Sequence, residues 1–338
     1  MEYNLRSDLM IEALENLKPE KGVVTNIKNI GNVKVTNVIV EKDGVLILNK
    51  KEGNYTTIEF DNIVDTSNNK KVEEIFVNEL KELIKLNNIK ENNTCLIVGL
   101  GNDLSTPDSL GPSVIKNVIV TKHLFDINSV SEGYREVSAI RPGVMGQTGI
   151  ETSEIILGII DRVKPDFLII VDSLAALSIS RINKTIQMTD TGIHPGSGVG
   201  NSRKEISKEN IKIPVIAIGV PTVVDATTIV NDTINSMYKH FAVTTDNVNN
   251  PMFKLIPNNS ISYRLSDKEL SDEEKKNLLG LIGTLNESER ISLIKEVLSS
   301  AQYNLMVTPK EIDFLIEKLS ELISNGINKS LHRQIIYM

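Results

Sequence analysis

The chain has 338 residues, a formal net charge of −7 and 24% charged residues. This length suits one large α/β domain with additions or two modest domains, and the charged fraction is typical of a folded globular protein rather than a disordered one. The acidic balance and scattered basic residues argue against direct nucleic-acid binding, and the scarcity of aromatic residues argues against a base-stacking platform or a carbohydrate groove.

The single cysteine and the hydropathy pattern further limit the class of protein and its cellular location. Cys95 lies in an apolar run, so we expect a buried, inert thiol rather than a nucleophile, and an internal disulfide is excluded. No apolar stretch approaches the roughly 20 residues that span a bilayer, and the first eight residues lack the apolar core of a signal peptide. We therefore expect a cytoplasmic protein with no membrane contact.

The first third of the chain predicts a small antiparallel β element followed by a helix. Residues 22–63 alternate between apolar and polar side chains, and Asp43-Gly44 is a candidate hairpin turn inside this stretch. Residues 72–86 place apolar side chains at helical spacing, which predicts an amphipathic helix.

The middle of the chain predicts an α/β core. Residues 95–100, 167–171 and 214–220 are short, continuously apolar runs, as expected for parallel strands buried on both faces, and each leads into small and polar residues. Residues 149–163 form a helical stretch before the second run. The alternation predicts a doubly wound, mostly parallel sheet, with ligands bound at the carboxyl ends of its strands.

The sequence beyond about residue 260 predicts helices. Thr308-Pro309-Lys310-Glu311 resembles a helix start with Thr308 as N-cap, and an apolar stripe follows it. The stripe consists of Ile312, Leu315, Leu319, Leu322 and Ile323.

Two aspartates follow the first two apolar runs. Asp108 lies in a glycine-rich turn that matches neither a dinucleotide-binding nor a phosphate-binding loop, and its alternative role is to begin a helix near Gly111. Asp172 follows the second run directly, and its alternative role is to cap a following helix. If both carboxylates point into one crevice, they can share one proton, so that one activates water while the other polarises a carbonyl group.

A third polar segment, residues 189–201, contains four glycines and therefore forms a loop. Its Asp190-Thr191-Gly192 matches the active-site triplet of pepsin-like proteases, but those enzymes carry it in an all-β fold that this chain does not predict. We favour a supporting role for Asp190. His194 can orient a carboxylate or bind a metal, but a loop histidine satisfied by its neighbours is the more common case.

Other hydrolytic mechanisms find little support. The sequence has no G-x-S-x-G, H-E-x-x-H or C-x-x-C motif, and its four histidines are far apart. A metal held by Asp108, Asp172 and a third ligand is left open.

The glycine-rich turn, the run through Asp172 and residues 190–226 together resemble the germination proteases of spore-forming Firmicutes. The most specific part of the resemblance is the loop His194 to Asn201 with the run Gly219 to Ala226. Similar segments occur at residues 5–9, 308–313 and 323–328, so the resemblance spans nearly the whole chain.

The resemblance implies an aspartic endopeptidase that needs no cofactor, with Asp108 and Asp172 as catalytic residues. The supporting loop residues are Asp190, His194, Gly196, Gly198, Asn201 and Asp225. It also implies a fold similar to that of the hydrogenase maturation proteases. Because those carry acidic metal ligands at the matching positions, a metal-dependent protease is the alternative, and a non-catalytic spore protein-binding module is a further one.

Members of this family are homotetramers made as inactive zymogens in the forespore, and they digest small acid-soluble spore proteins at germination. The resemblance therefore implies a protein substrate, a tetramer and a spore-core location. It maps autoprocessing to the Asp8–Leu9 bond, although Met10 stands where alanine is usual and the leader is short. The alternative is a frayed terminus.

We accordingly divide the chain into a propeptide, residues 1–8, and a single protease domain, residues 9–338. Within that domain we expect the β element at 22–63, the α/β catalytic core at 90–260 and a mainly helical region at 265–338.

Overall fold

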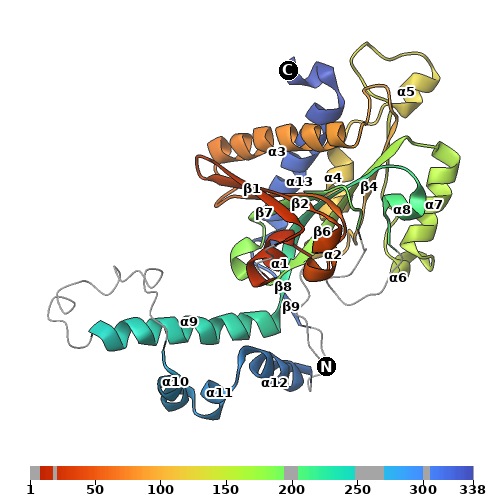
Figure 1. Cartoon of the computed structure of the whole chain (residues 1–338). Coiled ribbons are helices and arrows are strands. Elements are labelled where there is room, and N and C mark those ends of the chain that lie inside the picture. The colour runs from red at the N-terminus through yellow and green to blue at the C-terminus, as the bar shows by residue number, and fades with distance from the viewer. Residues whose placement is uncertain (1–7, 18–20, 194–204, 248–269, 300–304, 338) are drawn as a thin grey trace. The chain divides into compact units, whose positions relative to one another are not determined.

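The structure is a computed structural model that describes residues 8–17, 21–193, 205–247, 270–299 and 305–337 (Figure 1). These residues divide into two compact units. The larger unit draws on described residues between 8 and 223 and between 308 and 337, and the smaller unit on those between 224 and 307. Within the described parts of the chain, no helix is long and apolar enough to cross a membrane.

One mixed sheet runs through the larger unit in the order β1-β2-β3-β7-β8-β6-β4-β5. Its strands are β1 (Val23–Ile30), β2 (Val33–Val40), β3 (Gly53–Glu59), β4 (Cys95–Gly99), β5 (Val137–Ile140), β6 (Phe167–Ala176), β7 (Thr185–Thr189) and β8 (Val215–Asp225). β4 pairs in parallel with β5 and β6, whereas the β1–β2, β2–β3, β3–β7 and β7–β8 pairs are antiparallel. The predicted antiparallel element near the N-terminus is thus confirmed, and β3 joins it to the core sheet through β7.

Helices cover both faces of this sheet, which confirms the predicted α/β architecture (Figure 1). Cys95 and Ile97 of β4 pack with α3 (Thr66–Leu86), α4 (Leu110–Asn117) and α13 (Ile312–Leu331). Leu96 and Val98 face the other way, towards α7 (Thr152–Val163) and α8 (Lys208–Ile211). The alternation follows from the two-residue period of a strand, so a central strand must be apolar throughout.

Two short helices lie on the face of the sheet opposite α3. Met10 of α1 (Met10–Leu17) and Leu48 of α2 (Lys42–Leu48) pack with Val38, Val40 and Tyr55 from β2 and β3. The remaining short elements of the larger unit are η1 (Thr106–Asp108), α5 (Lys122–Asp126), α6 (Met145–Thr148), η2 (Ile179–Arg181) and η7 (Arg333–Tyr337).

The hairpin turn predicted at Asp43-Gly44 is wrong, because these residues lie inside α2. Gly44 packs directly on the backbone of Gly22, where a Cβ on either residue would collide with the other. The hairpin is closed instead at Gly31, whose φ of 63° lies in the left-handed region that glycine tolerates.

The helix start predicted at Thr308 is also wrong. The Thr308 hydroxyl donates a hydrogen bond to the Thr222 carbonyl (2.9 Å) rather than capping a helix, and α13 begins at Ile312. The predicted stripe is confirmed, because Ile312, Leu319, Leu322 and Ile323 are buried and Leu315 packs against the same core.

The smaller unit is mainly helical, and its helices beyond residue 260 agree with the helical region predicted there. It contains α9 (Ala226–Asn247), α10 (Asp272–Leu279), α11 (Leu281–Thr284), α12 (Glu287–Ser299) and β9 (Met306–Val307), which pairs with the end of β8. Arg290 of α12 donates hydrogen bonds to Asn231 (2.9 Å) and Asn235 (2.8 Å) of α9, which joins the two helices.

Candidate active site

The turn after β4 holds Asp108 in a defined place. Asp108 is the last residue of η1, where its amide donates to the Ser105 carbonyl (2.8 Å) and its own carbonyl accepts from the Asn102 amide (2.9 Å). Gly101 has a φ of 115°, and a Cβ there would collide with the Asp108 carbonyl oxygen. The glycine is therefore needed both for its conformation and for the close approach of the turn.

The start of α4 packs tightly against the strands that precede the two aspartates. A Cβ on Gly111 would collide with the backbone of Leu100 and approach the Val171 carbonyl oxygen. The same Val171 carbonyl accepts a hydrogen bond from the Leu100 amide (2.8 Å), and η1 lies beside β6. The structure therefore brings the Asp108 turn beside the part of β6 where Asp172 follows Val171.

Asp172 lies inside β6, not after its end. The strand continues to Ala176, so the alternative that Asp172 caps a following helix is wrong. The predicted strand ended at Val171 because the apolar run stops there, but the polar residues that follow keep the extended conformation. Asp172 is 6% exposed, and its Oδ1 accepts a hydrogen bond from the Ser173 amide (2.9 Å).

The alternation of β6 determines which face Asp172 occupies. Phe167, Ile169 and Val171 belong to the core beneath α3, so Asp172 and Leu174 lie on the opposite face. On that face, Leu174 packs with Leu9 at the N-terminal side of α1. Asp172 and the predicted processing bond therefore share one face of the sheet.

Asp190 is held by three donors. Its Oδ1 accepts from the Asn54 amide (2.8 Å), and its Oδ2 accepts from the side chains of Asn54 (2.7 Å) and Asn87 (3.1 Å). These contacts join β7, β3 and the end of α3, which fits a supporting role.

Of the remaining predicted loop residues, the structure describes only Asp225. In the smaller unit, Asp225 accepts a hydrogen bond from the Thr227 amide (2.7 Å) in the first turn of α9. His194, Gly196, Gly198 and Asn201 lie outside the described residues.

The chain around the predicted processing bond is anchored to β6. The Asp8 amide donates to the Ala175 carbonyl (3.4 Å), and the Ala175 amide donates to Oδ2 of Asp8 (3.0 Å). Leu9 is fully buried in a cluster with Ile11, Leu174 and Ala176.

Two residues that the sequence analysis did not select contact this bond. The Asp8 carbonyl oxygen accepts hydrogen bonds from Lys50 Nζ (3.3 Å) and Gln187 Nε2 (3.1 Å). Gln187 Oε1 accepts from the Met10 amide (2.5 Å), so this side chain contacts both sides of Leu9. Burial lowers the pKa of Lys50, and the charges of Asp8 and Glu12 act in the opposite direction.

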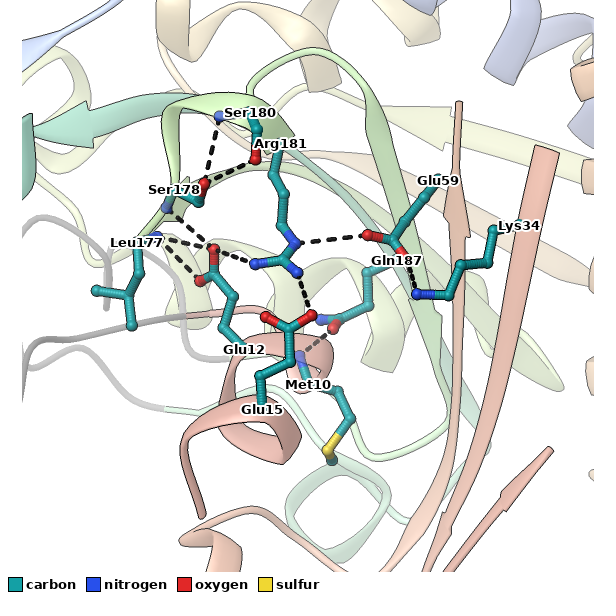
Figure 2. A network of polar contacts seen from close by, with 10 residues as sticks. All are labelled: Met10, Glu12, Glu15, Lys34, Glu59, Leu177, Ser178, Ser180, Arg181 and Gln187. Carbon is teal, nitrogen blue, oxygen red and sulfur yellow. Dashed lines mark hydrogen bonds and ion pairs between the residues drawn. The ribbon is translucent and has the colours of Figure 1, made fainter. Parts of the chain in front are cut away.

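A polar network fixes α1 beside these contacts (Figure 2). Glu12 is 2% exposed, and its carboxylate accepts from the amides of Leu177 (2.9 Å) and Ser178 (3.2 Å). Arg181 lies between Glu12 (3.4 Å), Glu15 (2.6 Å) and Glu59 (3.5 Å), and links α1 to β3. Burial alone would lower the pKa of Arg181, but the hydrogen bond with Glu15 and the three carboxylate charges raise it.

Among the described residues, no three or more His, Cys, Asp or Glu side chains come together in a group that could hold a metal ion. Cys95, the thiol set aside above, is buried, and burial raises its pKa, so it behaves as a core residue.

Comparison with known proteins places the chain among the peptidases. The sequence model of the family described as germination protease matches residues 5–337. Proteins named germination protease are 47% identical in a Geobacillus strain, 48% in Bacillus cereus and 49% in Bacillus mycoides, and each alignment covers 98% of this chain and 95% of the relative. The chain belongs to the germination protease family.

Among solved structures, the chain is similar to a nickel-iron hydrogenase maturation protease from Thermococcus kodakarensis, with 20% identity and a TM-score of 0.28. The match covers 42% of this chain and 80% of that one.

Proposed function

We propose that this member of the family is an endopeptidase that begins the degradation of small acid-soluble spore proteins during germination, cutting after acidic residues. It acts in the spore core as a homotetramer, and Asp108 and Asp172 form its catalytic pair. The observation that most supports the pair is the meeting of the Asp108 turn with β6 at the Val171 carbonyl, one residue before Asp172.

The chemistry follows from what two carboxylates can do together. Two like charges at close range do not ionise independently, so the pair holds one proton. The ionised member takes a proton from water, and the water oxygen adds to the carbonyl carbon. The protonated member polarises the carbonyl oxygen, and the C–N bond breaks as the leaving nitrogen takes up a proton.

The same proposal includes a zymogen that processes itself between Asp8 and Leu9. Asp8 lies against β6, and its neighbour Leu9 packs on Leu174, two residues from Asp172 in the same strand. Asp8, the last residue of the leader, lies against the strand that carries Asp172. The leader therefore keeps a protein substrate away until it is removed.

Incubation of the purified chain with a small acid-soluble spore protein, with and without EDTA, tests the proposal. Mass spectrometry follows both the substrate fragments and the new N-terminus of the chain. We expect the enzyme to cleave the substrate after acidic residues, and EDTA should not affect this cleavage. Asp108→Asn and Asp172→Asn should each reduce the cleavage rate by about a thousandfold or more.

Asp190→Asn is the matched control, because it removes another carboxylate of the same unit, one that is held by Asn54 and Asn87, and leaves the proposed pair intact. Urea unfolding of every variant shows that activity, and not folding, has been lost. Cleavage abolished by EDTA would point to a metal-dependent peptidase instead, and cleavage retained by either Asn variant of the pair would refute the aspartate mechanism.

A further inference from the structure

The contacts around Asp8 describe a binding site for an acidic residue, an inference that rests on the proposed autoprocessing. Asp8 forms hydrogen bonds with three residues: the backbone of Ala175 and the side chains of Lys50 and Gln187. Gln187 is 7% exposed, and Lys50 is partly buried. The site is therefore built into the protein and is not a chance contact on its surface.

The carbonyl oxygen of Asp8 receives two hydrogen bonds from side chains. Hydrolysis of the Asp8–Leu9 bond adds water to the carbon of this group, so negative charge develops on the same oxygen before the C–N bond breaks and the Leu9 nitrogen takes up a proton. Donors already directed at such an oxygen stabilise the charge as it forms. Lys50 supplies a positive charge as well as a donor, and Gln187 supplies a neutral amide.

The acidic side chain is recognised separately. The Ala175 amide donates to Oδ2 of Asp8 at 3.0 Å, and Lys50 Nζ lies 3.3 Å from the carbonyl oxygen of the same residue, where the Asp8 charge favours the protonated form of the lysine. An asparagine at position 8 would keep the shape but lose the negative charge that Lys50 faces. Discrimination between the two therefore depends on Lys50.

The residue after the bond has its own site. Leu9 is fully buried against Leu174 and Ala176, with Ile193 packed on the same cluster. Gln187 connects the site for Asp8 with the site for Leu9, because its side-chain amide contacts the carbonyl of Asp8 and the backbone amide of Met10. The structure thus presents an acidic residue followed by an apolar one, held across the bond between them.

We propose that Lys50 is the residue that selects an acidic side chain before the cut, and that Gln187 is a positioning residue that holds the bond across Leu9. The chain's own leader is the first occupant of this site. A protein substrate cut after Asp or Glu takes the place of Asp8 once the leader has left, with its carboxylate against Lys50 and the Ala175 amide.

Autoprocessing of the full chain tests this inference. Intact-mass spectrometry follows the appearance of chains that begin at Leu9. Chains with Asp8 and chains with Asp8→Asn are compared in three backgrounds: wild type, Lys50→Met and Lys51→Met. Lys51 is the matched control, since it is the adjacent lysine and pairs with Glu205 and Glu209 instead. The ratio of the two processing rates within one background cancels any uniform loss of folded or active chain.

We expect the chain with Asp8 to be processed about tenfold faster than its Asp8→Asn variant in the wild type and in Lys51→Met, and about equally fast in Lys50→Met. Lys50→Arg keeps the charge and should keep the preference. An undiminished preference in Lys50→Met overturns the role of Lys50, and equal rates in the wild type overturn the acidic site while leaving the peptidase intact. A wild-type chain that processes neither form overturns the proposed autoprocessing, and this inference with it.

Discussion

The two segments that reach the Asp172 region are held in different ways. The turn that carries Asp108 is fixed by backbone packing, because Gly101 and Gly111 allow main-chain atoms to approach one another closely. The segment from Asp8 to Glu12 is fixed by side chains, chiefly through Lys50, Gln187 and Arg181. The first should therefore respond to added volume and the second to lost charge or lost hydrogen bonds.

The largest effect should come from volume added to the turn. Gly111→Ala places a Cβ against the backbone of Leu100 and near the Val171 carbonyl, and neither can move without distorting β4 or β6. We expect a loss of about 4 kcal/mol in the free energy of unfolding, because a clash with backbone is not relieved by a change of rotamer. Urea unfolding measures this loss, and peptidase activity should fall as the Asp108 turn shifts.

A glycine with open surroundings gives the matched control. Gly158 lies within α7, where nothing approaches an added Cβ within 4 Å. Gly158→Ala should stabilise the protein by up to about 1 kcal/mol, since alanine is the better helix former. Equal effects of the two substitutions would show that the tight packing at Gly111 does not hold the turn.

The next largest effect should come from the network that fixes α1. Glu12→Ala removes the buried carboxylate that accepts from the amides of Leu177 and Ser178 and pairs with Arg181. We expect a loss of about 3 kcal/mol, because two partly buried amide donors and a largely buried guanidinium lose their partner together. Thermal or urea unfolding of the full chain measures it.

Glu15 tests whether burial, and not the ion pair itself, causes the loss. It pairs with the same guanidinium at 2.6 Å, but its side chain is half exposed. Glu15→Ala should cost less than about 1 kcal/mol, as is usual for exposed pairs. A loss as large as that of Glu12→Ala would assign the stabilisation to Arg181 charge pairing alone.

The sequence predicted the features of the fold and of the candidate site that depend on local residue patterns. The continuous apolar runs identified β4, β6 and β8, and the spacing of residues 72–86 identified α3. Asp108 and Asp172 were selected because each follows such a run. The ends of β6 and β8 were placed too early, since a strand can continue through residues such as Asp172 and Ser173 once its neighbours pair with it.

The contacts on Asp8 depend instead on tertiary packing. Lys50 and Gln187 lie 42 and 179 residues away along the chain, and they meet Asp8 only when α1 packs on the sheet. Gln187 did leave a local signal, because a polar residue between Ile186 and Met188 in a buried strand needs a hydrogen-bonding partner. Lys50 left none, since it is one of two adjacent lysines and only the fold separates their roles.

The pH dependence of stability should also test how tightly α1 packs on the sheet. Tyr55 packs with Met10 beneath α1, and burial, with the charge of Asp190 adding to it, raises its pKa to about 12. The folded state favours the neutral phenol, so this contribution is intact below about pH 10, where an unfolded tyrosine begins to ionise, and is lost as the pH rises towards 12.

The loss should amount to about 2 to 3 kcal/mol across that interval. Urea midpoints measured between pH 9 and 12 should fall more steeply for the wild type than for Tyr55→Phe, which has no group to ionise at this position. Parallel pH curves for the two proteins would show that the phenol is not buried beneath α1.

Apart from the control substitutions, the smallest effect on stability should come from Asp190, which tests whether the aspartates in this protein have different roles. Asp190→Asn replaces one acceptor oxygen by an amino group that faces the donors on Asn54 and Asn87. We expect a loss of about 1 to 2 kcal/mol, because part of this hydrogen bonding is lost and the charge that strengthened it is gone. The rate of substrate cleavage per folded chain should stay within about threefold of the wild type.

The opposite result would reassign the chemistry. If Asp190→Asn left stability unchanged but abolished cleavage, the triplet Asp190-Thr191-Gly192 would take part in the reaction, and its contacts with Asn54 and Asn87 would serve to orient a reacting carboxylate. A loss of stability with cleavage retained assigns these contacts to joining β3, β7 and the end of α3. Asp190 then differs from Asp172 in what its carboxylate does, although both aspartates follow buried stretches of strand in the same sheet.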